Sequence, residues 1–161
     1  KLQRISDYTF SKCISLTEIK IPGNIREIGY KSFSGCSGLR EISIPSTVKT
    51  VGIGAFENCT ELKDISLPTT LTEINYYTFS GCTSLTTLTL HSKLTAINNY
   101  AFAGCKSLTE IHCKNSNPPL IGENTFRDVN RIGCKIFVPS KRAKKSYSTA
   151  LYWNEFTIYI E

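Results

Sequence analysis

Hydrophobic residues recur along this chain of 161 residues at a fixed interval of 23 positions. Each copy carries a phenylalanine with a cysteine three residues later, and aliphatic residues on either side. The phenylalanines are Phe10, Phe33, Phe56, Phe79 and Phe102, followed after one extra residue by Phe126. The cysteines are Cys13, Cys36, Cys59, Cys82 and Cys105, and Val129 takes the sixth place. Repetition at about 20 to 50 residues is typical of a solenoid, so we predict a stack of about six units that bury one another's apolar side chains.

Every repeat contains a short I-x-[IL] segment, often closed by proline, as at Ile42, Ile44 and Pro45. This alternation predicts a short strand with one buried face, which the proline ends because it has no N–H to donate. Since about twenty residues separate successive copies, the strands should run parallel and stack at roughly 4.8 Å. The apolar pattern before each phenylalanine is too short for a long helix, and we expect a turn or a short helical piece there.

The polar residues of these strands should form columns on the exposed face of the sheet. One column precedes the first buried residue of each strand, and the other lies between the two buried residues. We predict that the columns are the partner-binding surface, because a rigid core holds them and they lose little entropy on binding. The candidate residues are Glu18, Lys20, Glu41, Ser43, Asp64, Ser66, Thr89, Glu110 and His112.

A ridge of tyrosines just before the repeat phenylalanines is the alternative surface, at Tyr76, Tyr77 and Tyr100. Tyrosine is enriched at binding hot spots. The same side chain also packs its ring along a ridge while its hydroxyl stays in water. The sequence leaves both roles open.

The repeat pattern changes near the C-terminus. We assign residues 1–138 to the repeat array and residues 139–161 to a C-terminal cap. Ser140 has the chemistry of a helix N-cap, and Tyr147 follows at helical spacing, so a short helix and a final extended segment should cover the open end of the core. The N-terminus has no such cap, and we therefore expect further repeats before Lys1.

Positive charge is dense near the C-terminus of this chain, whose formal net charge is +6; Lys141, Arg142, Lys144 and Lys145 form a cluster. Such a patch suits a solvated helix face or an anionic glycan or lipid. No nucleic-acid-binding motif accompanies it, so we predict no nucleic acid partner. No run of about 18 apolar residues occurs, so we predict no membrane span in this sequence.

Seven cysteines raise the question of disulfides or a metal site. Five occupy one repeat position, where parallel side chains give poor geometry for a bridge, and no C-x-x-C or H-x-x-x-H spacing supports zinc. Because Val129 fills the sixth place, we predict small, buried, reduced thiols. Cys113 and Cys134 lie outside this series and are the best pair for a bridge, which the sequence leaves open.

Neither a catalytic group nor a cofactor site is recognisable. His91 and His112 are the only histidines, and neither has an acid and a nucleophile at a familiar spacing, so we expect both at the surface. Cations such as Lys20 and Lys49 interrupt the acidic column, and no loop concentrates oxygen ligands for calcium. Phosphate-loop and nucleophile motifs do not occur. We predict a protein that is not an enzyme and needs no cofactor.

The repeat resembles that of the BspA-like leucine-rich repeat family, also called the treponema-type repeat. Its pattern A-F-x-x-C-x-x-L-x-x-I-x-I-P is nearly intact over residues 55–68 and recurs over residues 101–111. Residues 136–153 are similar to the segment that closes such arrays, and the resemblance covers residues 2–160.

The resemblance implies a bacterial or protozoan protein that is extracellular or held at the cell surface. Some family members are adhesins that bind host matrix proteins, other bacteria or host cells. The partner would then be a protein or glycan on a host or bacterial surface. Our main hypothesis is a non-enzymatic recognition module, and the alternative is a structural spacer that holds another domain away from the cell.

Overall fold

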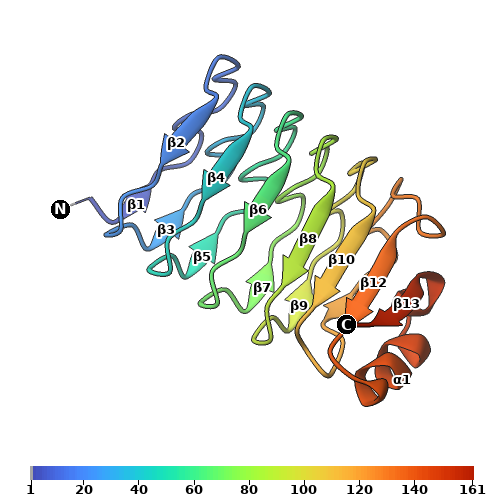
Figure 1. Cartoon of the computed structure of the whole chain (residues 1–161). Helices are drawn as coiled ribbons and strands as arrows, with labels where there is room; N and C mark the ends of the chain where they lie inside the picture. Colours follow the sequence, from blue (N-terminus) through green and yellow to red (C-terminus); the bar gives the residue numbers. More distant parts are fainter. Residues whose placement is uncertain (1) are drawn as a thin grey trace.

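The computed structural model describes residues 2–161, which form a solenoid of parallel strands (Figure 1). The longer strands lie side by side along one face and run from the N-terminal to the C-terminal end. They are β2 (Glu18–Lys20), β4 (Glu41–Ser43), β6 (Asp64–Ser66), β8 (Thr87–Leu90), β10 (Glu110–Cys113), β12 (Lys135–Val138) and β13 (Thr157–Ile160). Strands β2, β4 and β6 pair as one sheet, and β8, β10, β12 and β13 pair as another. The predicted I-x-[IL] strands and their parallel stacking are confirmed.

A second face is built from two-residue strands, which were not expected, and from turns, which were one of the two expected alternatives. These strands are β1 (Arg4–Ile5), β3 (Glu27–Ile28), β5 (Thr50–Val51), β7 (Glu73–Ile74), β9 (Ala96–Ile97) and β11 (Leu120–Ile121). Turns follow them and carry the repeat phenylalanines. The backbone reason is visible around Phe79, where Tyr77 and Gly81 have φ angles of 58° and 74°. A right-handed helix cannot pass through two left-handed residues so close together, so this part of the repeat turns instead.

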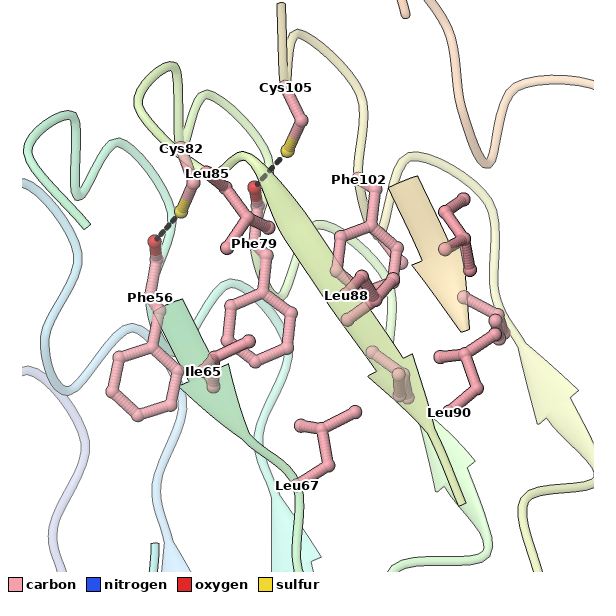
Figure 2. Packing of buried hydrophobic residues seen from close by; sticks show 14 of the residues in the cluster. Phe56, Ile65, Leu67, Phe79, Cys82, Leu85, Leu88, Leu90, Phe102 and Cys105 are labelled. Atoms are coloured by element: carbon pink, nitrogen blue, oxygen red, sulfur yellow. Dashed lines mark hydrogen bonds between the residues drawn. The ribbon is translucent and has the colours of Figure 1, made fainter. Parts of the chain in front are cut away.

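The core is a continuous stack of the repeat phenylalanines. Phe79 is 1% exposed, and its ring lies nearly parallel to those of Phe56 and Phe102, with centroids 5.5 and 5.4 Å away. At the C-terminal end Phe126 meets Trp153 edge-on at 5.8 Å. The aliphatic residues of both strand sets belong to the same buried cluster. Figure 2 shows those of the longer strands in the middle rungs, such as Ile65 and Leu88.

The cysteine series is buried from Cys36 onward, as predicted, and its thiols also donate hydrogen bonds. The Sγ atoms of Cys82 and Cys105 lie 3.3 Å from the carbonyl oxygens of Phe56 and Phe79 (Figure 2). Burial raises the pKa of Cys105 to about 12. The exception is Cys13, in the first rung. It is exposed because the described residues form no further rung on the N-terminal side of that first rung.

Helix α1 (Lys141–Thr149) follows the last repeat, with the predicted N-cap: the Ser140 hydroxyl accepts a hydrogen bond from the Ala143 N–H at 3.1 Å. Ala143 and Tyr147 are buried against the core. The short 3-10 helix η1 (Trp153–Glu155) follows, and Trp153 donates its Nε1–H to the carbonyl of Pro119 at 2.8 Å. Strand β13 then extends the longer-strand face by pairing with β12.

Candidate binding surface

The longer strands place the predicted outward residues in straight columns. In the register of β2, β4 and β6, Glu18 lies opposite Glu41, and Glu41 lies opposite Asp64. The neighbouring column is formed in the same way by Lys20, Ser43 and Ser66. All six side chains are exposed, while the isoleucines between the columns face the core. Backbone pairing therefore fixes the spacing of this polar surface.

These six residues line one shallow hollow of about 880 Å³ in the N-terminal half of the face. Gly23 and Pro45, which follow β2 and β4 along the chain, also line it. The sequence does not single these two out as surface residues, although Pro45 is part of the repeat motif. Three carboxylates and one cation, Lys20, line the hollow, so it is acidic on balance. In residues 2–161 the carboxylates of Glu18, Glu41 and Asp64 form no ion pair. Like charges directly opposite on neighbouring strands destabilise a sheet, so this column repels itself.

The other three candidates lie in the C-terminal half of the face, outside the hollow. Thr89, on β8, is opposite His112, and His112 is opposite Phe137. The rings of His112 and Phe137 stack with centroids 4.8 Å apart. Strand pairing thus continues the second column, but with aromatic side chains in place of small polar ones.

In this half, unlike in the hollow, the carboxylates have nitrogen partners. The Nδ1 atom of His112 lies 2.7 Å from Glu161 Oε1, and its Nε2 atom lies 3.5 Å from Glu110 Oε2. Lys114 Nζ lies 2.6 Å from the other oxygen of Glu161. The hydrogen bond from Lys114, followed by the one from His112, lowers the pKa of the Glu161 carboxyl. The role of Glu161 had no signal in the sequence, since it lies 49 residues from His112.

Two of the three ridge tyrosines stack on each other, and all three are at least partly exposed. Tyr77 and Tyr100 stack in parallel with centroids 4.9 Å apart. Tyr76 is 45% exposed and Tyr77 is 39% exposed. The rings therefore pack on one another while part of their surface stays in contact with solvent, and a role of the ridge in binding stays a prediction.

His91 is buried, contrary to the expected surface position. It stands where other repeats have proline, and it is only 8% exposed. Its Nδ1 accepts a hydrogen bond from the Lys93 N–H at 3.2 Å, and its Nε2 has no partner among residues 2–161. Burial lowers the pKa of this imidazole. The ring is thus a buried side chain at the repeat position of proline, which gives it a packing role.

Residues 2–161 also show how the candidate metal-binding and disulfide-forming side chains are arranged. No group of three or more His, Cys, Asp or Glu side chains in residues 2–161 is arranged to hold a metal ion. Cys113 and Cys134, the pair considered for a bridge, are both buried free thiols. In the same part of the chain, no helix combines the length and the apolar character that crossing a membrane requires.

Solved structures with this fold come from several bacteria. A leucine-rich cell surface protein from Faecalibacterium prausnitzii is 30% identical, with a TM-score of 0.72, over 83% of this chain and 35% of its own length. A leucine-rich repeat protein of T. pallidum is also 30% identical, with a TM-score of 0.66, over 69% of this chain and 52% of its own. The pneumococcal vaccine antigen PcpA, at 23% identity and a TM-score of 0.64, shares the fold over 90% of this chain and 41% of its own. The chain thus spans about a third to a half of these proteins.

A family model identifies the family of this chain more directly than the solved structures do. The model described as the BspA type leucine-rich repeat region matches residues 3–141 in six copies, and it agrees with the resemblance in the repeat motif. No curated protein matches the chain. This solenoid family is generally non-catalytic, and the neighbours point to a surface repeat protein. Because this model matches most of the chain, repeat by repeat, the chain belongs to the BspA-type leucine-rich repeat family.

Proposed function

We propose that the chain is a non-enzymatic recognition module of a cell-surface or secreted protein, and that it binds a protein partner through the acidic hollow. The observation that carries the proposal is the column of Glu18, Glu41 and Asp64, held in register and without ion pairs in the described residues. A partner with basic side chains would relieve the repulsion within this column. The cell-surface relative from Faecalibacterium prausnitzii supports the proposed location.

Preorganisation supports the same surface. The strands fix the backbone of the hollow, and buried residues such as Ile42 and Ile65 anchor it from below. A partner therefore has little of this surface to order when it binds, which lowers the entropic cost of association. Opposite charge across such an interface raises the association rate and the specificity more than the affinity.

The test begins with a screen of the chain against host matrix proteins and bacterial surface proteins, read by surface plasmon resonance at two salt concentrations. The partner found is then measured against the double variant Glu41→Lys/Asp64→Lys. The matched control is Glu73→Lys/Glu123→Lys, which makes the same change of net charge at exposed positions off this face. We expect the association rate to fall at least about tenfold in the first variant and to change little in the control.

The alternative surfaces give distinct outcomes. Loss of binding in Tyr76→Ala/Tyr77→Ala, with normal binding in the charge variant, would move the site to the tyrosine ridge. Specific binding that neither pair of substitutions affects would reject both surfaces. A screen without any specific partner would favour the spacer function, in which the array holds another domain away from the cell.

A further inference from the structure

Helix α1 lies at the C-terminal end of the solenoid, away from β2, β4 and β6 (Figure 1), and its exposed side chains are densely positive. Four of its first five residues are basic: Lys141, Arg142, Lys144 and Lys145. All four are exposed, and none forms an ion pair within residues 2–161. The helix itself contains no acidic residue.

The position of these cations lowers the stability of the helix. The N-terminus of a helix carries a partial positive charge, so Lys141 and Arg142 in the first turn are repelled by it. The first turn holds no acidic residue to offset this repulsion. Lys141 also lies one turn from Lys144 and Lys145, and like charges at that spacing destabilise a helix further. Folding therefore gives no reason for this arrangement, whereas an anionic ligand would.

The remaining surface of α1 narrows the class of ligand. Its apolar residues Ala143 and Tyr147 are fully buried against the core, so the helix has no apolar face to insert into a lipid layer. Its exposed face carries no aromatic ring on which a nucleobase could stack. What it offers is charge alone, repeated along an axis at about 1.5 Å per residue. A linear polymer with regularly spaced anionic groups complements such a surface.

We propose that the exposed face of α1 is a second binding site, and that it takes an acidic polysaccharide bearing sulfate or carboxylate groups. The site uses Lys141, Arg142, Lys144 and Lys145 as point charges, with affinity that falls as salt rises. It is separate from the acidic hollow, because β2, β4 and β6 lie toward the other end of the array (Figure 1). The two sites together would let one module bind a protein partner and a charged glycan at once.

The test measures binding of a heparin octasaccharide by calorimetry at 50 and 150 mM NaCl. The variant is Lys144→Gln/Lys145→Gln, and the matched control is Lys49→Gln/Lys63→Gln, which removes the same charge from exposed positions in the third repeat. At about 1 kcal/mol for each cation near an anionic surface, we expect the α1 variant to bind about 30-fold more weakly. The control should stay within about threefold of the unmodified chain. Circular dichroism confirms that both variants fold.

Equal weakening in the two variants would overturn the proposal, because binding would then follow net charge and not the α1 surface. So would unchanged binding in the α1 variant. Two further probes separate the ligand classes: vesicles containing phosphatidylglycerol and a single-stranded RNA oligonucleotide. Binding of either probe through α1 at lower concentration than the octasaccharide would reject the polysaccharide and assign the site to that ligand instead.

Discussion

Truncation of the central phenylalanine tests whether the stacked rings hold the array together. The ring of Phe79 is fully buried and stacks against both Phe56 and Phe102. Phe79→Ala should lower the free energy of unfolding by about 3–5 kcal/mol, through lost burial and the cavity left behind. The two ring contacts account for about 1–3 kcal/mol of this loss.

The chain contains its own control at the N-terminal end of the stack. Phe10 is half-buried and stacks against Phe33 alone, with centroids 5.0 Å apart. Since its ring is only partly buried and has a stacking partner on one side alone, Phe10→Ala should cost only about 1–2 kcal/mol. Urea unfolding followed by circular dichroism gives both values on one scale.

Hydrogen exchange then locates the damage. Rungs contact only their neighbours in a solenoid, so Phe79→Ala should expose amides near Phe56 and Phe102 more than amides in the first repeat. Equal loss of protection at Ile19 and Ile111 would refute this locality. A cost for Phe10→Ala as large as that for Phe79→Ala would refute the explanation by burial.

Three further expectations concern thiols, a histidine and the helix. Thiol titration of the folded chain should detect Cys13 alone, and the other six cysteines should react only after unfolding. Burial shields them and raises the pKa of Cys59, Cys113 and Cys134 to about 12. Native disulfides found by mass spectrometry would contradict this expectation. Burial lowers the pKa of folded His91 below its unfolded value of 6.5, so the unfolded chain binds protons more readily and the free energy of unfolding should fall as the pH drops from 7 through the folded pKa. His91→Asn should remove that part of the pH dependence of stability, and an unchanged pH profile would contradict the role of His91. Lys141→Glu should raise the free energy of unfolding by about 0.3–1 kcal/mol through the helix dipole, whereas Ser148→Glu in the last turn should not; a gain at both positions would exclude the dipole as the cause.

The repeat made most of the solenoid predictable. A period of 23 residues fixes which side chains stack, and the I-x-[IL] segments of Ile42 and Ile65 fall in strands as expected. The two-residue strands before the phenylalanines were not predicted, because two residues are too few to show alternation. The burial of His91 was also missed, since its polarity suggests the surface and only the surrounding rung shows a space to fill.

The site was predictable only in part, for a related reason. Register followed from the repeat, so the columns of Glu41 and Ser43 could be placed in advance. Their electrostatics depended on contacts between distant residues. The sequence offers no sign that Glu161 contacts His112 and Lys114, or that Glu41 forms no ion pair within residues 2–161. These differences separate the acidic hollow from the rest of the face.

The even spacing of the thiols makes folding compete with thiol oxidation. In the folded chain, Cys36 to Cys105 are covered by neighbouring rungs. In the unfolded chain the same thiols are open to any oxidant, and the short loops between them make their cross-linking easy. Native contacts between adjacent rungs form over the same short separation, and local contacts of this kind favour fast folding. Where the chain folds under oxidising conditions, the yield of native protein therefore depends on each rung packing against its neighbours before its cysteine is oxidised.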